Sequence, residues 1–169
     1  SYPSGNVIWN MGMSDEYNTG IDNICTDLGF SFPHHIQLLD DGSLLFFDNG
    51  NLSEMLMDDE YPTSRIRRLR VIDNSYCEPI WEYELSEELF GLGMGSVQLL
   101  NNGNYFIYSF GSGGDSPNCS VFEVTPDHEI VWKYEADNNV ALYRSYKIPS
   151  LHPDVFSVVA QNYILNDGF

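Results

Sequence analysis

Hydrophobic and aromatic residues occur along this chain in short runs separated by turn-forming dipeptides. Runs rich in β-branched and aromatic residues predict β-strands at 43–47, 65–72, 80–85, 104–110, 119–124 and 129–135. Asp41-Gly42, Asn49-Gly50 and Asn102-Gly103 separate or end these runs and supply the positive φ angles that tight hairpins require. Helical periodicity is weak, apart from one possible turn at 85–91 with Ser86 as its N-cap. The pattern predicts an all-β fold of antiparallel strands.

One segment of the chain occurs twice. Residues 36–50 read IQLLDDGSLLFFDNG and residues 97–111 read VQLLNNGNYFIYSFG. Each copy is followed by a Trp-x-Tyr strand, at 79–85 and at 130–136, and a third fragment, NVIWN, lies at 6–10. Such self-similarity indicates a repeat architecture. The repeated unit has four antiparallel strands, which is the composition of a β-propeller blade.

We therefore interpret residues 1–169 as a single β-propeller segment. Blade-like units span about 31–85 and 93–136, and pieces of neighbouring blades lie at 1–30 and 137–169. Because a propeller closes with at least four blades, this is a partial propeller. We expect its partner to be the remaining propeller chain or further copies in a self-assembly. An open β-sandwich of two sheets is the structural alternative.

Acidic residues dominate the charge of the chain. It carries 25 Asp and Glu against 7 Lys and Arg, a net charge of −18. This balance argues against nucleic-acid binding, which needs a positive surface. No apolar run approaches the ~20 residues of a membrane-spanning helix, so no membrane insertion is expected. The few basic residues either neutralise neighbouring acids or bind an anion, and six of them fall in two short segments: Arg65, Arg67, Arg68, Arg70, Arg144 and Lys147.

Cysteine and acidic residues give two weaker expectations. The three cysteines cannot all pair within the chain, and one disulfide, between Cys77 and Cys119, is possible because both lie in comparable predicted loops. The acidic run at 58–60 lies in the long predicted loop 51–63 and could hold calcium, which favours several carboxylate oxygens. The run lacks the EF-hand pattern, and no other cofactor or metal is expected.

The pair His34-His35 directly precedes the first copy of the repeat, where the second copy has Gly95 and Ser96. A departure from the internal repeat singles out these histidines, because imidazole can serve as base, nucleophile or ligand. The alternative is that one histidine only ends a strand. Asn49 should lie at the same end of the sheet as His34, because a hairpin brings the start of one strand close to the end of the next.

Several of these motifs together resemble the bacterial arylsulfotransferase family. They are FPHHIQLLDDGSLLFFDNGN, SRIRRLRVI, IWEYEL and MGSVQLLNNGNYFIYSFG, and the resemblance runs over about 32–151. It implies a six-bladed propeller that is periplasmic or secreted. It also implies transfer of a sulfuryl group from a small aryl sulfate to a phenol through a histidine, without a nucleotide donor.

The resemblance assigns roles to particular residues. His34 matches the histidine before the family's hairpin, Arg65 the arginine of the Ser-Arg strand, and Asn49 the asparagine of FDNG. His34 and Arg65 are therefore expected to be catalytic, and Asn49 to contact substrate. His35 has no clear counterpart in the family and joins the expected catalytic residues as the neighbour of His34, and Arg144 joins the expected substrate contacts as one of the clustered basic residues. The alternative function is that of a non-catalytic extracellular β-propeller that acts as a binding or assembly module.

Overall fold

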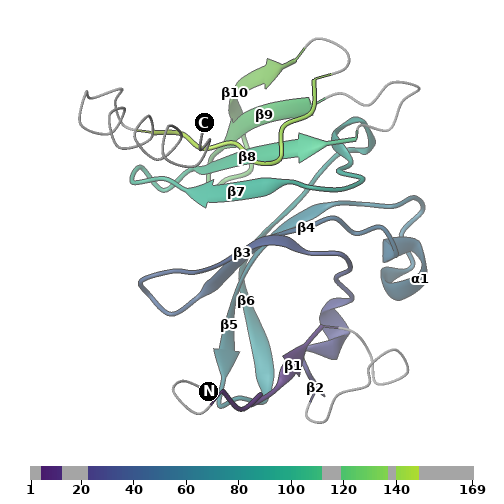
Figure 1. The fold of residues 1–169 in the computed structure, drawn as a ribbon, viewed down its shortest axis with the longest axis vertical. Coiled ribbons are helices and arrows are strands. Elements are labelled where there is room, and N and C mark those ends of the chain that lie inside the picture. Colours follow the sequence, from purple (N-terminus) through teal and green to yellow (C-terminus); the bar gives the residue numbers. More distant parts are fainter. Residues whose placement is uncertain (1–4, 13–22, 112–118, 137–139, 149–169) are drawn as a thin grey trace, which may run out of the picture.

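The computed structural model describes residues 5–12, 23–111, 119–136 and 140–148. Two four-stranded antiparallel sheets lie face to face (Figure 1). The first sheet contains β3 (His34–Leu38), β4 (Leu44–Asp48), β5 (Arg65–Ile72) and β6 (Tyr76–Glu84), in that order. The second contains β7 (Ser96–Leu99), β8 (Tyr105–Phe110), β9 (Cys119–Val124) and β10 (Ile130–Glu135), also in chain order. The prediction of an all-β fold with four antiparallel strands per unit is confirmed.

The two copies of the repeated segment form matching hairpins. In the β3–β4 turn the N–H of Gly42 donates to the carbonyl of Leu39 at 2.9 Å, and in the β7–β8 turn Gly103 donates to Leu100 at 2.9 Å. Gly42 and Gly103 have φ angles of 79° and 88°. Only glycine adopts this geometry without a steric penalty, which is why both copies keep it at this position.

The remaining elements are short. The predicted turn at 85–91 forms the 3₁₀ helix η2 (Glu87–Leu89), but the side chain of Ser86 makes no capping hydrogen bond. The loop 51–63 contains an unpredicted helix, α1 (Ser53–Met57). A second 3₁₀ helix, η1, spans Thr26–Leu28. At the end of the fragment 6–10, Asn10 begins the two-residue strand β1 (Asn10–Met11), which pairs in parallel with β2 (Asn23–Ile24).

Apolar side chains lie on both faces of each sheet. The main core fills the space between the sheets and includes Leu45, Phe47, Ile66, Val97, Ile107 and Phe122, all with 0% exposure. On the outer face of the first sheet, Phe46 and Leu69 pack against Phe30 from the N-terminal segment. On the outer face of the second sheet, Phe106, Tyr108 and Val121 form another cluster. Side chains alternate along each strand, so neighbouring residues enter different clusters.

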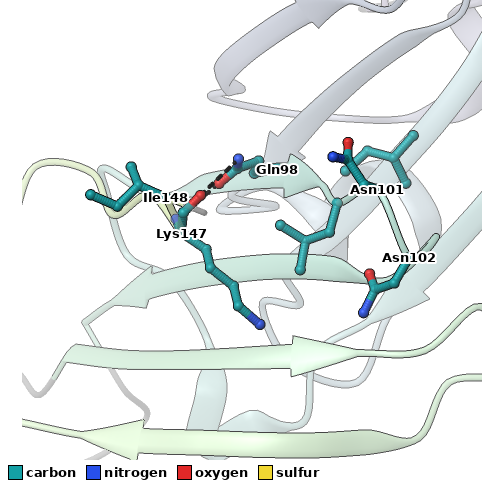
Figure 2. A pocket seen from close by; sticks show the side chains of 7 residues that line it. Gln98, Asn101, Asn102, Lys147 and Ile148 are labelled. Atoms are coloured by element: carbon teal, nitrogen blue, oxygen red, sulfur yellow. Dashed lines mark hydrogen bonds between the residues drawn. The ribbon is translucent and has the colours of Figure 1, made fainter. Parts of the chain in front are cut away.

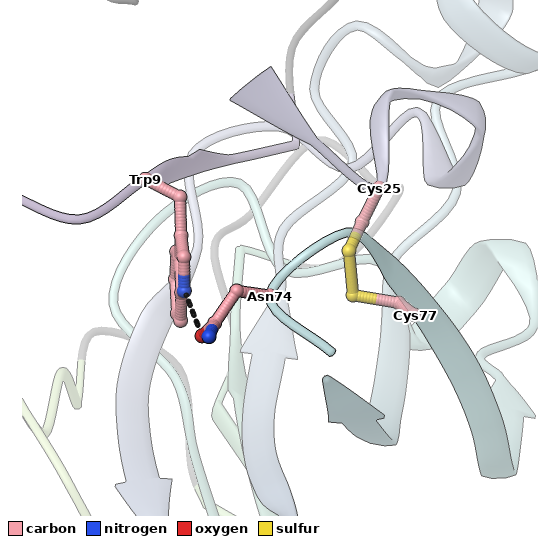
Figure 3. Close-up of a disulfide and its surroundings, with 4 residues drawn as sticks. All are labelled: Trp9, Cys25, Asn74 and Cys77. Carbon is pink, nitrogen blue, oxygen red and sulfur yellow. Dashed lines mark hydrogen bonds between the residues drawn. A yellow bond between two sulfur atoms is a disulfide. The ribbon is translucent and has the colours of Figure 1, made fainter. Parts of the chain in front are cut away.

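The predicted pairing of Cys77 with Cys119 is wrong. Cys77 forms a disulfide with Cys25, and the two Cα atoms are 5.3 Å apart (Figure 3). Cys77 lies on β6, beside the cluster that packs against the N-terminal segment carrying Cys25. Cys119 is a free, fully buried thiol on β9, in the outer cluster of the second sheet. The two sheets therefore keep Cys77 and Cys119 apart.

In the described ranges, no helix is long and apolar enough to cross a membrane.

Candidate functional site

His34 begins β3 and meets Asn49 at the end of β4. Its Nδ1 atom lies 2.7 Å from Oδ1 of Asn49 and 3.0 Å from the backbone carbonyl of Phe32. Both neighbours can only accept a hydrogen bond, so Nδ1 carries the ring proton and donates it. In the neutral ring the unprotonated nitrogen is therefore Nε2, on a half-buried side chain. The structure brings His34 and Asn49 together at one end of the first sheet, as predicted.

Asn49 is held in one orientation by its surroundings. Its side chain is fully buried, and Nδ2 donates to the carbonyls of Gly91 at 2.6 Å and Met94 at 3.1 Å. Its backbone carbonyl accepts a hydrogen bond from the hydroxyl of Ser64 at 2.7 Å. Because both amide hydrogens point to carbonyls, Oδ1 must face His34 as an acceptor. The amide of Asn49 thus fixes the tautomer of His34.

The loop between the sheets reaches Asn49 because two glycines let it pack directly on Phe47. A Cβ atom on Gly91 would lie 2.8 Å from Cζ of Phe47, and one on Gly95 would lie 2.8 Å from Cδ1. Gly95 also has a φ angle of 104°, which a residue with a side chain rarely adopts. Larger residues would displace the loop, and the carbonyls that orient Asn49 would move with it.

His35 takes a different path from His34. It lies in a β-bulge of β3, where the register against β4 shifts, and its φ angle is 53°. Nδ1 accepts a hydrogen bond from the backbone N–H of Val97 on β7 at 3.1 Å, and Nε2 lies 3.1 Å from the hydroxyl of Tyr146. Both ring nitrogens therefore have partners, and His35 joins the two sheets.

Arg144 belongs to the surroundings of His35. Burial lowers the pKa of His35 below its ordinary value of 6.5, and the positive charge of Arg144 lowers that pKa further. The guanidinium of Arg144 lies 5.0 Å from the ring centroid of Tyr143. Four of the five sequence-predicted residues thus fall into two groups, His34 with Asn49 and His35 with Arg144.

Arg65 is engaged with acidic groups. Its guanidinium donates to Asp59 at 2.8 Å and to Glu84 at 2.9 Å, and the residue is 3% exposed. Its cross-strand partner on β4 is Asp48, next to Phe47. Since successive side chains point to opposite faces, Arg65 lies on the other face from Phe47 and the inter-sheet core.

The other arginines of β5 also pair with acids. Arg67 donates to Asp48 at 2.9 Å and to Glu82 at 2.6 Å, and Asp48 is 1% exposed. Arg68 and Arg70 both reach Asp41, at 2.9 Å and 3.3 Å. Of the two interpretations of this arginine cluster, neutralisation of neighbouring acids is the one observed.

The first two residues of the acidic run at 58–60 have separate roles. Asp58 ends α1 in a left-handed conformation, and Asp59 binds Arg65. In the portions of the chain that the structure describes, no three His, Cys, Asp or Glu side chains are placed to hold a metal ion.

A pocket of about 440 Å³, whose lining does not include His34, lies on the second sheet (Figure 2). Its lining runs along the end of β7 and its turn and includes Gln98, Leu99, Leu100, Asn101, Asn102, Lys147 and Ile148. It opens at the β7–β8 turn, whereas Met94, which binds Asn49, precedes the other end of β7.

Sequence reasoning missed two residues that contact His35. Nε2 of Gln37 lies 3.3 Å from Nδ1 of His35 and donates to the carbonyl of Val97 at 2.7 Å, and the hydroxyl of Tyr146 lies 3.1 Å from Nε2 of His35. A signal for Gln37 was present, because the repeat keeps glutamine at this position as Gln98. Nothing in the local sequence marks Tyr146, which is 111 positions from His35.

No family model matches the sequence, and no curated protein matches it. The geometry around His34 therefore carries the functional argument.

Proposed function

We propose that this chain is part of a secreted, arylsulfotransferase-like β-propeller in which His34 transfers a sulfuryl group from an aryl sulfate to a phenol. The observation that carries the proposal is the 2.7 Å contact between Nδ1 of His34 and Oδ1 of Asn49. It places the proton on Nδ1 and leaves the lone pair on Nε2. A neutral imidazole with a fixed lone pair is a competent nucleophile.

The proposed reaction has two displacement steps at sulfur. In the first, Nε2 of His34 attacks the sulfur of the aryl sulfate, the S–O bond to the aryl group breaks, and phenolate leaves with the electron pair. In the second, the acceptor phenol gives its proton to solvent and attacks the same sulfur, and the N–S bond breaks. His34 is then restored. Asn49 would stabilise the sulfated ring by accepting from Nδ1–H throughout.

Arg144 is a better candidate than Arg65 for contact with the sulfate oxygens. Arg65 could reach an anion only by giving up its pairs with Asp59 and Glu84. Arg144 is on the surface, beside Tyr143 and Tyr146, and its charge already acts on His35, the neighbour of His34. A guanidinium suits this task because its fork of donors matches a tetrahedral oxyanion.

The propeller architecture is supported by the apolar residues on the outer faces of both sheets. In a two-sheet sandwich the inner faces form the core and the outward residues are polar. Here Phe46 and Leu69 lie on one outer face and Phe106 and Tyr108 on the other. Stacked blades, each covered by the next, account for such two-sided sheets.

A location outside the cytoplasm is supported by the disulfide between Cys25 and Cys77. Disulfides persist in oxidising compartments such as the periplasm and the extracellular space, and are rare in the cytosol.

The proposal is tested with the full chain, a chromogenic aryl sulfate and a phenol. We expect phenolate release and an enzyme species heavier by one SO₃ group in rapid-quench mass spectrometry. His34→Ala should abolish both. His128→Asn is the matched control, because His128 sits in a turn at φ 69°, a conformation that asparagine tolerates. An unchanged rate in His34→Ala would remove His34 from the mechanism.

The second candidate function is that of a non-catalytic binding or assembly module. The observation that favours it is the exposed apolar strand β10, where Val131, Trp132 and Tyr134 are about half exposed, at 54%, 48% and 54%. Absence of both phenolate release and the SO₃ adduct in the unmodified chain would support this function over the first.

A further inference from the structure

We infer that the outer face of the second sheet, the face turned away from the first sheet, binds another four-stranded unit of the same repeat and that Trp132 bonds to it. The inference rests on the propeller architecture of the proposed function and on the contacts between repeated units, and it does not depend on sulfuryl transfer.

A tryptophan–turn hydrogen bond recurs along the chain. The indole Nε1 of Trp81, on β6, donates to the carbonyl of Pro126 at 2.9 Å, in the turn between β9 and β10. The indole Nε1 of Trp9 donates to Oδ1 of Asn74 at 3.0 Å, in the turn between β5 and β6 (Figure 3). In both cases the tryptophan precedes a unit and binds the turn between that unit's third and fourth strands.

Trp132 is the equivalent of Trp81 in the second unit. Trp81 pairs with Arg68, which pairs with Leu45, and Trp132 pairs with Glu123, which pairs with Phe106. The surroundings of the two tryptophans nevertheless differ. Trp81 stacks on Tyr105 of the next unit with centroids 3.7 Å apart, whereas Trp132 is 48% exposed. Within the described ranges its indole N–H meets no acceptor.

The outer face of the second sheet, around Trp132, resembles the inner face of the first sheet, which already packs against a unit. Leu45, Phe47 and Ile66 of the first sheet have 0% exposure in the inter-sheet core. By strand register their equivalents in the second sheet are apolar or aromatic as well: Phe106, Tyr108 and Val121. A surface that keeps the same pattern predicts the same kind of occupant.

A short segment that would begin that occupant already lies beside β7. The carbonyl of Val97 on β7 accepts from Nε2 of Gln37 on β3 at 2.7 Å. One unit later, Gln98 on β7 donates to the carbonyl of Lys147 at 3.1 Å and accepts from its N–H at 2.9 Å (Figure 2). Residues 145–148 thus lie beside β7 as β7 lies beside β3, and Lys147 takes the place of Val97.

Further polar contacts hold this segment on the second sheet. Ser96 exchanges hydrogen bonds with the backbone of Ser145, at 3.2 Å and 3.1 Å. Glu123, which is 6% exposed, pairs with the ammonium group of Lys147 at 2.5 Å. The second sheet therefore contacts residues 145–148 both through its edge strand β7 and through Glu123. We place the rest of the further unit on the remaining outer surface around Trp132.

The register dictates a direct test. Lys147 corresponds to Val97, so residue 148 corresponds to residue 98. A tandem chain in which residue 148 is followed directly by residues 99–169 therefore contains a complete third unit, which starts at residues 145–148. Trp132→Ala is made in the full chain and, separately, in the tandem chain, where only the first of the two copies of Trp132 is replaced. Urea unfolding then measures the effect of the substitution in each chain. Trp81→Ala in the full chain is the matched control for a tryptophan that already has its partner.

In the full chain, Trp132→Ala should change the unfolding equilibrium constant far less than Trp81→Ala does. In the tandem chain it should change that constant at least about 30-fold, in the range of Trp81→Ala, because a stacking contact and a hydrogen bond are lost. The inference is overturned if Trp132→Ala has the same small effect in both chains. It is equally overturned if the tandem chain fails to fold cooperatively while the full chain does.

Discussion

The backbone N–H of Val97 donates to Nδ1 of His35 across the boundary between the two sheets, at 3.1 Å. The carbonyl of Val97 is bound by Gln37 from the same strand, β3. The backbone N–H and carbonyl of Val97 on β7 are therefore hydrogen-bonded by side chains of β3, and not by the backbone of a neighbouring strand. The sheets remain separate layers, and a histidine with a fixed tautomer holds them together.

As the pH is lowered, the hydrogen bond between Val97 and His35 should weaken at a higher pH than the one at which most carboxylates become protonated. Protonated Nδ1 cannot accept the Val97 N–H, and the pKa of His35 is lowered from 6.5 by burial and by Arg144. With a lowered folded-state pKa, stability is full above the unfolded pKa and is lost as the pH falls toward the folded pKa. The urea midpoint should therefore be lower at about pH 5 than at about pH 7.5.

His35→Asn is the control for this pH dependence. Asparagine tolerates the φ angle of 53°, and its Oδ1 can accept from Val97, but it does not titrate. The variant should fold and lose much of the difference between the two pH values. An unchanged difference would assign the pH dependence to other groups.

Asn49→Asp separates the two roles of the Asn49 amide. The carboxylate can still accept from His34 but cannot donate to the carbonyls of Gly91 and Met94. We expect a loss of roughly 1–3 kcal/mol of unfolding free energy for each unsatisfied carbonyl. Asn51→Ala, which removes a bond to Leu92 at the surface, should cost about 1 kcal/mol or less. Equal costs in urea unfolding would contradict the special position of Asn49.

Arg67→Met should leave Asp48 as a buried charge without its ion-pair partner. Both residues are at most 3% exposed, so we expect a loss of about 3–5 kcal/mol in unfolding free energy. Adding Asp48→Asn should recover part of it, because the amide oxygen can still accept from Ser31 and Gly50. Arg70→Met, at a 42% exposed side chain, should cost under about 1 kcal/mol. Thermal or urea unfolding of Arg67→Met, Asp48→Asn and the double variant checks the pairing. We expect the loss of unfolding free energy in the double variant to be smaller than the sum of the two single losses.

The disulfide should contribute substantially to stability. Cys25 and Cys77 are 52 positions apart, and a cross-link over such a loop contributes about 4 kcal/mol by the chain-entropy relation. The double variant Cys25→Ser, Cys77→Ser should therefore unfold at a clearly lower urea concentration. Under non-reducing conditions the unfolded wild-type chain should react with thiol reagents only at Cys119. Labelling of all three cysteines would contradict the pairing.

Strand positions were predictable where the strands have local signals. The bounds of β5 and β9 coincide with the predicted 65–72 and 119–124. β6 begins at Tyr76, before the predicted 80, and so includes Pro79. Proline lacks an N–H and normally marks the end of a strand, but β6 is an edge strand, and the register shifts next to Pro79. The position of a strand in its sheet thus decides whether proline is tolerated.

The helix α1 shows the limit of periodicity. Five residues are too few to display a helical pattern, so 51–63 read as a loop. The tertiary structure stabilises the turn, because the buried hydroxyl of Ser53 accepts from the N–H of Thr63 at 2.8 Å. Gly50 also packs against the backbone of Thr63, and this closes the loop.

The sequence by itself determined the repeat, the hairpins and the all-β character, because turn geometry and side-chain alternation act over a few neighbouring residues. Only the tertiary structure decided which partners the chemically active side chains take. His34 keeps Nε2 available while His35 is bound to Val97, 62 positions away, and Cys77 pairs with Cys25 and not with Cys119. The physical reason is that buried hydrogen-bond donors and acceptors must find partners, and a disulfide needs two thiols in contact, and both kinds of partner come from segments that only folding brings together.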